Sequence, residues 1–302
     1  MAVITTGNHP KALWPGIRKW WGRQYDEHKV EHTDLFTPEN STQAYEEDVQ
    51  VTGFGLAPVK AEGAGISYDS ETQGYTSRYT HVAYALGYIC TFEELRDNLY
   101  EVVSKRRARA NAFSMRQTKE NVGANVYNRA FNSSFTGGDG TELIATSHST
   151  LSGNQSNHLT TAADLSEASL EDLIIQIMGA TNDRGLKISL MPRSLIVPRQ
   201  LWFEANRILK STLQNDSANN AINVLRATNA LPDGIKVNHY LTDADAFFVR
   251  TNVPNGMICF DRDKIPLEQD NDFDTKNAKA AAYERYSFGW TDWRGVYGSP
   301  GA

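Results

Sequence analysis

The chain has 302 residues and a formal net charge of −6, with 40% hydrophobic and 10% aromatic residues. This composition excludes a disordered chain, and the length allows one large domain or two of moderate size. No apolar run reaches the roughly 18–20 residues of a membrane-spanning helix. The acidic balance gives no reason to expect tight binding of duplex nucleic acid over the whole surface.

The first residues and the cysteines indicate folding in a reducing cytoplasm. The N-terminal sequence lacks the apolar core of a secretory signal peptide. The two cysteines, Cys90 and Cys259, both stand among apolar residues. They are too few for a zinc site and are predicted to be buried free thiols, with a disulfide open only if their two strands are neighbours.

Residues 1–45 are predicted to form an arm and not a domain. Trp14, Trp20 and Trp21 fall on one helical face, and the rest of the segment is polar. Tryptophans on a mobile arm would expose apolar surface unless something covers them. We therefore expect Trp14, Trp20 and Trp21 to dock on a neighbouring subunit.

Residues 46–90 are predicted to form a long β-hairpin. One limb runs outward from Val49 to Val59, and a run rich in Tyr, Thr and Val returns over residues 75–90. An isolated two-stranded ribbon is marginally stable in water, so we expect its tip to lie on another subunit. The tip consists of Glu62, Gly63, Ala64 and Gly65.

Residues 91–131 are predicted to be one long helix. Thr91 and Glu94 have the spacing of a capping box. Apolar residues then recur every three or four positions, and a bend or break is expected at Gly123, where their phase shifts. A helix of about 30–40 residues spans roughly 45–60 Å, which suits the spine of an elongated molecule.

Four basic residues lie close together on this helix: Lys105, Arg106, Arg107 and Arg109. The simpler interpretation is a solvated or salt-bridged surface. The functional interpretation is contact with a scaffold or with nucleic-acid phosphates, without readout of base sequence. Arg106 falls on the apolar stripe and is expected to pair with a buried carboxylate.

The rest of the chain is predicted to mix helices and short strands, which makes the fold α+β. A polar loop over 132–166 precedes a helix over 166–182. A buried strand over 194–197 leads through Pro198 into a helix that ends at Leu209, and residues 215–220 are Asn-rich and loop-like. Further strands are expected over 235–240, 246–250, 257–260 and 283–290.

The last stretch, residues 280–302, is unusually aromatic. Tyr286, Phe288 and Trp290 alternate with polar or small residues, as in a strand with one buried face. Trp290 is therefore expected to be buried. Trp293 follows the strand in a Gly-flanked segment and is expected to pack at the boundary with a neighbouring subunit.

The acidic and glycine-rich motifs do not make a metal or phosphate site. Asp270, Asp272 and Asp274 begin like a calcium loop, but Thr275 and Ala281 occupy the positions that need Gly and Glu. The glycine pairs in the hairpin lack the Gly-Lys-Ser/Thr ending of a phosphate loop. We expect no metal and no cofactor.

The histidines do not indicate a catalytic site either. His28 and His32 have the spacing of helical zinc ligands but no third ligand nearby, and we interpret them as a surface pair. His148 and His158 lie among serines, as in a hydrolase. The chain lacks a Gly-x-Ser-x-Gly elbow, and no carboxylate is evident that could orient a histidine.

Several motifs resemble the major capsid proteins of tailed bacteriophages. The ending GWTDWRGVYGSPG resembles the C-terminal tail of that family, and ALWPGIRKWW near the start resembles the N-terminal arm of one branch. DGTELIAT and GNQSNHL resemble the loop after the long helix, and LIVPRQLWFEANRIL resembles the strand–Pro–helix that opens the A domain. Together these motifs span residues 11–302 in the order of the family.

The resemblance implies the Hong Kong 97-type capsid fold, which encapsulin nanocompartments also use. In that α+β fold the expected parts are an N-terminal arm over 1–45, an extended β-hairpin E-loop over 46–90 and a P domain with the spine helix over 91–193. A mixed A domain over 194–256 and a return to the P domain over 257–302 would complete the chain.

The resemblance also implies a function, that of a major capsid protein and not an enzyme. Such a chain self-assembles through pentamers and hexamers into an icosahedral phage head that encloses double-stranded DNA. The partners implied are further copies of the chain, a scaffolding protein, a portal and non-specifically bound DNA, with a decoration protein as an open candidate and no membrane. The expected location is the virion, reached by assembly in the host bacterial cytoplasm.

Two alternatives stay open: an encapsulin-like nanocompartment shell with the same fold, and a soluble Ser/His hydrolase. No charged heptad segment precedes the arm, so a separate scaffolding protein is expected unless the mature chain has been cleaved. Some family members join a Lys to an Asn between subunits. Lys60 lies near the hairpin tip, but no partner Asn is evident, and no crosslink is predicted.

Overall fold

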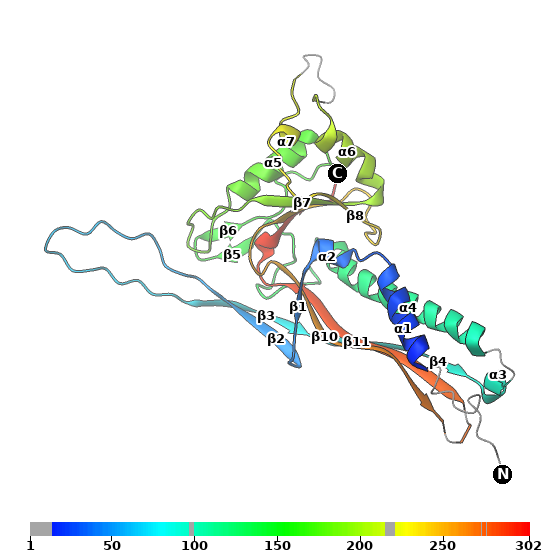
Figure 1. The fold of residues 1–302 in the computed structure, drawn as a ribbon. Coiled ribbons are helices and arrows are strands. Elements are labelled where there is room, and N and C mark those ends of the chain that lie inside the picture. The colour runs from blue at the N-terminus through cyan, green and yellow to red at the C-terminus, as the bar shows by residue number, and fades with distance from the viewer. Residues whose placement is uncertain (1–13, 97–99, 215–220, 273, 276) are drawn as a thin grey trace, which may run out of the picture.

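The computed structural model describes residues 14–96, 100–214, 221–272, 274–275 and 277–302. They form a lower body, an upper body and a long arm that projects from between them (Figure 1). The lower body contains the sheet β1-β10-β11-β4 and the upper body the sheet β12-β9-β7-β8. This mixture of helices and strands is the predicted α+β class. Among the described helices, none is long and apolar enough to cross a membrane.

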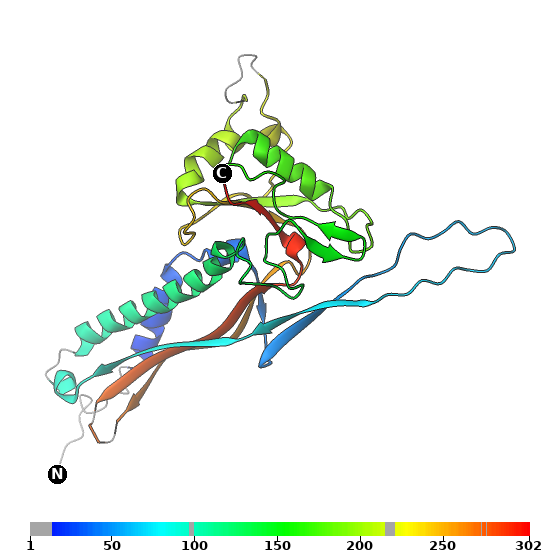
Figure 2. The ribbon, with the colours of Figure 1, turned by 180° about the vertical axis from the view of Figure 1, so that it is seen from behind.

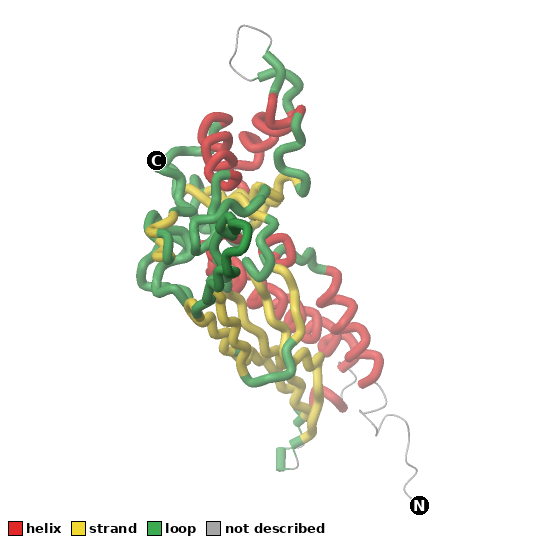
Figure 3. The backbone as a smooth tube through the Cα atoms, turned by 90° about the vertical axis from the view of Figure 1, so that its left-hand side faces the viewer, coloured by secondary structure: helices red, strands yellow, loops and turns green. Residues whose placement is uncertain are grey.

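The lower body is a sheet with helices on one face (Figure 3). Small side chains on the long helix, Ala108 and Ala112, are buried where that helix meets its neighbours. The helices are α1 (Trp14–Glu27), α2 (His32–Leu35), α3 (Phe92–Arg96) and α4 (Tyr100–Asn128). The strands are β1 (Thr37–Asn40), β4 (Val82–Cys90), β10 (Met257–Asn271) and β11 (Ala278–Trp290).

Helix α1, in the segment predicted as an arm, packs on helix α4 of its own chain. The Trp21 side chain is buried, stacks on Tyr25 at 5.1 Å and donates a hydrogen bond from Nε1 to Asn111 Oδ1 at 2.9 Å. Trp20 is half-buried. Trp21 is therefore not an intersubunit aromatic, because α4 already covers the apolar face of α1. The side chain of Trp14 lies outside the described part.

The predicted long helix is present as α3 and α4, with residues 97–99 outside the described ranges. The backbone N–H of Glu94 donates to Thr91 Oγ1 at 3.4 Å, as the capping pattern predicted. A bend or break was expected at Gly123, and the helix is not broken there, since α4 continues to Asn128. A Cβ at Gly123 would lie 3.2 Å from the Phe288 ring and 3.4 Å from His32 Cβ. Glycine therefore lets α4 lie close to β11 and α2.

The hairpin is shorter in its paired part than predicted. Strands β2 (Tyr45–Val51) and β3 (Gln73–Thr80) form the ribbon, and residues 52–72 continue it as an extended loop (Figure 2). The returning run was expected to stay in the hairpin to residue 90. Instead β4 pairs antiparallel with β11, and Tyr84 of β4 stacks on Tyr286 at 4.8 Å.

The upper body is a four-stranded sheet with α5 and α6 on one face. Its strands are β7 (Pro192–Pro198), β8 (Gly234–Asn238), β9 (Phe247–Thr251) and β12 (Val296–Ser299). Its helices are α5 (Glu167–Met178), η3 (Arg199–Leu201), α6 (Trp202–Lys210) and α7 (Val224–Ala227). A small hairpin of β5 (His148–Thr150) and β6 (Gly153–Gln155) and the short helix η4 (Trp293–Gly295) lie beside it. Residues 215–220, interpreted as an Asn-rich loop, lie outside the described residues.

The two bodies share a core at the other face of the upper sheet. Side chains alternate along a strand, so Leu195 and Val197 face α5 and α6 whereas Ile196 faces the lower body. The C-terminal segment serves both bodies, because β11 belongs to the lower sheet and β12 completes the upper one. The shared core consists of Leu35, Phe36, Tyr127, Ala130, Leu143, Ile144, Ile196, Leu241, Ala246, Phe248, Met257, Cys259 and Val296.

Candidate functional site

The aromatic C-terminal segment is anchored inside its own chain. Trp293 is 2% exposed, and its ring stacks on His148 with centroids 4.2 Å apart and planes at 4°. Asn157, fully buried, donates from Nδ2 to the carbonyl oxygens of Leu143 at 2.7 Å and Val296 at 2.9 Å. It also donates to the carbonyl oxygen of Trp293 at 3.1 Å. These contacts fix the path of the chain from β11 to β12.

The burial of the two C-terminal tryptophans is the reverse of what was expected. Trp293, predicted to pack against a neighbouring subunit, is the buried one, and Trp290 is only half-buried. Trp290 is the last residue of β11, and its ring lies over Gly137, where a Cβ would come within 2.6 Å of Trp290 Nε1. Trp293 therefore offers no surface to a second copy.

Arg294 holds three segments together beneath this anchor. It is 2% exposed and pairs with Asp183 at 2.7 Å and Asp292 at 3.3 Å. Its guanidinium also donates to Gln155 Oε1 at 3.2 Å and to the carbonyl oxygen of Thr181 at 3.0 Å. Burial raises the pKa of Asp292, and the charge of Arg294 opposes that rise.

His148 has the carboxylate partner that the sequence did not reveal. Nδ1 lies 2.6 Å from Asp139 Oδ2, and Nε2 lies 3.0 Å from Asn157 Oδ1. Both ring nitrogens are thus engaged, and the side chain is completely buried under Trp293. This geometry holds a loop in place and leaves no ring nitrogen to activate a serine.

Of the remaining predictions, the one for His28 and His32 is wrong and the one for the two cysteines is confirmed. His32 is buried and bonds Glu120 at 2.7 Å, so the interpretation of His28 and His32 as a surface pair is wrong. Cys90 and Cys259 are buried free thiols, as predicted. Within the described ranges, no cluster of three His, Cys, Asp or Glu could hold a metal ion.

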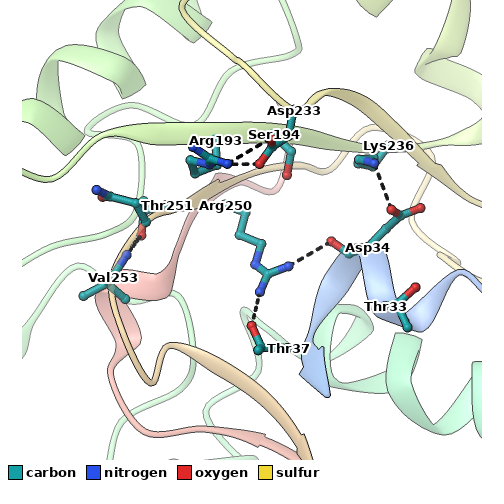
Figure 4. Close-up of a pocket in the computed structure, with 11 residues that line it drawn as sticks. Thr33, Asp34, Thr37, Arg193, Ser194, Asp233, Lys236, Arg250, Thr251 and Val253 are labelled. Carbon is teal, nitrogen blue, oxygen red and sulfur yellow. Dashed lines mark hydrogen bonds and ion pairs between the residues drawn. The ribbon is translucent and has the colours of Figure 1, made fainter. Parts of the chain in front are cut away.

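A polar cavity of about 490 Å³ lies where α2 and β1 meet the upper sheet (Figure 4). Arg193 pairs with Asp233 at 2.9 Å, and Lys236 pairs with Asp34 at 2.9 Å. Arg250 donates to Thr37 Oγ1 at 2.6 Å. The contacts of Lys236 and Arg250 join the two bodies, whereas Arg193 and Asp233 both belong to the upper one. We therefore interpret the cavity as a polar joint and not as a substrate pocket.

The extended loop over residues 52–72, called the arm below, is exposed along most of its length. All four tip residues, Glu62 to Gly65, are exposed, and Val59 and Tyr68 on its limbs are 100% and 93% exposed. Asp69 accepts a hydrogen bond from the Gly55 N–H at 2.8 Å, which ties the limbs together. This bond and one from the Ser70 N–H lower the pKa of Asp69. Arg184 of the upper body lies 3.6 Å from Asp69 and steadies the base of the arm.

The basic run on α4 is partly paired and partly exposed. Arg107 donates to Glu94 at 2.8 Å and to Cys90 Sγ at 3.2 Å, which joins α4 to α3 and β4. Arg106 and Arg109 are exposed, and Lys105 is half-buried. Arg106 was expected to pair with a buried carboxylate. That expectation is wrong, because the buried stripe of α4 runs through Ala108 and Ala112.

Sequence reasoning missed Arg294, Asn157 and Asp139 as anchoring residues. Each is a single polar residue with no periodic pattern around it. The resemblance motifs contain all three, and that was the available signal.

The two bodies and the projecting loop have the arrangement of the Hong Kong 97-type capsid fold. The virus-like particle from Pyrococcus furiosus superposes with a TM-score of 0.56 at 11% identity, covering 94% of this chain and 98% of that chain. A chain from Mycobacterium phage Che8 gives 0.52 at 16% identity, with 91% and 93% covered. One from Mycobacterium phage Patience gives 0.54 at 10% identity, with 98% and 88% covered.

The family is shown by the sequence itself. A family model described as phage capsid protein matches residues 74–299. Among curated proteins none matches the chain. The chain belongs to the phage capsid protein family and is a major capsid protein, a structural subunit of a multi-subunit shell in the virion.

Proposed function

We propose that this subunit assembles through pentamers and hexamers into an icosahedral head that encloses double-stranded DNA. The observation that carries the proposal is the arm, residues 52–72, whose apolar side chains have no core of their own. Leu56 is 83% and Ile66 is 69% exposed. The loop leaves these large apolar side chains in water, and we expect a second copy of the chain to cover them.

The proposed role is structural and not enzymatic. His148 is completely buried with both ring nitrogens engaged, which argues against a catalytic role for this histidine in a hydrolase. A nanocompartment shell that encloses protein cargo stays the second candidate, because it shares the fold.

The proposed partners beyond further copies are a scaffolding protein, a portal and packaged DNA, met in the host cytoplasm. Arg106 and Arg109, both exposed on α4, are candidates for contact with the scaffold or with DNA phosphates. Such contacts would be non-specific and would weaken as salt rises.

Purification of particles from cells that produce the whole virus tests the proposal. Particles treated with nuclease should retain double-stranded DNA and should contain this chain as their main protein. Particles filled with protein cargo and free of DNA would replace the phage head by the nanocompartment. A chain that stays monomeric throughout infection would contradict both.

A further inference from the structure

Helices α5 and α6 lie at opposite sides of the same face of the upper sheet. Helix α5 is to the left of α6 in Figure 1 and to its right in the reverse view of Figure 2. Both bury one face in the same core, through Leu173 and Ile177 of α5 and Ala205 and Ile208 of α6. Their opposite faces are turned to solvent.

The outer face of α5 combines apolar and acidic side chains. Asp172, Ile175 and Met178 follow one another at steps of three and form one exposed stripe. Ile175 is 67% and Met178 is 54% exposed. Glu171, four residues before Ile175, borders the stripe. The helix contains three carboxylates and no basic residue.

The outer face of α6 combines apolar and basic side chains. Phe203, Arg207 and Lys210 form one exposed stripe at steps of four and three. Phe203 is 66% exposed, and its ring lies 4.9 Å from that of Trp202, which is 47% exposed. Helices η3 and α6 together contain three basic residues and one carboxylate, Glu204, which pairs with Arg207 at 2.8 Å.

The charge of the α5 stripe is opposite to that of the α6 stripe, so each stripe is complementary to the other and repels a second copy of itself. Two α5 stripes placed face to face would set like charges together, and so would two α6 stripes, and both arrangements are repulsive. A two-fold contact of either stripe with itself is thereby disfavoured. A head-to-tail contact between different patches closes into a ring when the rotation between copies allows it.

We propose that the α5 stripe of one copy docks on the α6 stripe of the next copy and closes a ring of upper bodies. This inference rests on the proposed shell function and names the contact within each ring. Ile175 and Met178 pack against Trp202 and Phe203 at the centre of the contact. Carboxylates of α5 face Arg207 and Lys210 at its rim and set the direction of docking.

Charge reversal of each stripe tests the docking, with the full chain and its scaffold if one is needed. The first variant is Glu171→Lys with Asp172→Lys, and the second is Arg207→Glu with Lys210→Glu. Each places like charges across the contact, so each should lower the yield of rings and shells by at least about tenfold. A third variant combines all four changes and restores opposite charges. It should assemble again.

Conservative and apolar variants complete the test. Asp172→Glu with Lys210→Arg keeps every charge and should assemble as the wild type does. Ile175→Ser and Phe203→Ser should each lower assembly while the melting temperature of the free subunit stays unchanged, because both side chains are exposed. Yields are measured by electron microscopy and light scattering.

Three outcomes overturn the inference. The first is normal assembly of either two-residue reversal. The second is a folded four-residue variant that stays as unassembled as the two-residue variants. The third is normal assembly of Ile175→Ser and Phe203→Ser. If the wild type itself forms no shell, the proposed function fails with the inference, whereas a wild type that assembles beside unaffected variants defeats the inference alone.

Discussion

Because Trp293 stacks on His148 in a buried site, its replacement should cost more stability than replacement of Trp290. Replacing Trp293 by Ala opens a cavity in a buried site and should lower the free energy of unfolding by about 3–5 kcal/mol. Trp290→Ala removes a half-buried ring at the end of a strand and should cost less. Denaturant unfolding of the unassembled subunit measures both. Equal losses, or a larger loss for Trp290→Ala, would show that the stacking does not anchor the segment.

Arg294 is predicted to give a pH-dependent loss of stability when it is replaced. Arg294→Met leaves Asp183 and Asp292 without their buried cation and should cost about 3–5 kcal/mol near neutral pH. Burial already raises the pKa of Asp292 in the folded state, and removal of the positive charge raises it further. The folded variant then binds protons more readily than the unfolded chain does, so its stability falls as the pH rises through that pKa.

Unfolding of wild type and Arg294→Met at about pH 5 and about pH 8 checks this sign. The deficit of the variant should be larger at the higher pH. A deficit that is constant, or larger in acid, would mean that unpaired carboxylates are not its cause. Asp233→Asn serves as the control, because its ion pair with Arg193 is exposed and should contribute under about 1 kcal/mol.

The burial of single residues at this anchor could not be predicted from local pattern. Alternation places Tyr286, Phe288 and Trp290 on one side of a strand, and the strand is there. What buries Trp293 is His148, which lies far away in the sequence, and no periodic signal joins the two. The same holds for Arg294 and Asp183.

At the scale of elements, α4 presents two kinds of arginine. Arg106 and Arg109 are exposed, so changing both to Glu should alter the stability of the free subunit by less than about 0.5 kcal/mol. It should nevertheless reduce scaffold engagement or DNA retention. Arg107→Glu is the matched comparison, because it breaks the contact with Glu94 and should destabilise the free subunit more. Particle yield and genome content unchanged in the double variant would leave the basic run as a solvated surface.

The arm is the element whose removal should separate folding from assembly. Deleting Glu62–Ile66 shortens the tip and spares the contact between Asp69 and Arg184. The melting temperature of the free subunit should not change, since the arm makes no core, but shells should not form. Normal particles from the shortened chain would show that the tip is not an intersubunit element.

Helix α4 was predictable because its periodicity is local, whereas strand pairing was not. Residues 82–90 read as the returning limb of a hairpin, but they pair with β11, whose residues lie far along the chain. A run of Tyr, Thr and Val fits either partner. The same ambiguity led to the prediction that residues 1–45 dock on a neighbouring subunit, because the apolar face of α1 could pack on another copy or on α4 of its own chain.

At the scale of the whole molecule, the two bodies share one core, whereas the arm has none. This is the structure expected of a subunit whose exposed apolar surface is covered by neighbouring copies. The resemblance of the motifs predicted the fold, and the family match supports it. Neither the sequence nor the fold shows which surface of one copy contacts which surface of the next copy. That information lies in exposed side chains such as those on the arm, α5 and α6.

Cryo-electron microscopy of the assembled particle, reconstructed without imposed symmetry, tests the central claim most directly. The account predicts a closed icosahedral shell in which residues 52–72 of each copy lie on a neighbouring copy. Particles without closed symmetry, or a shell in which the arm of each copy touches no other copy, would contradict it.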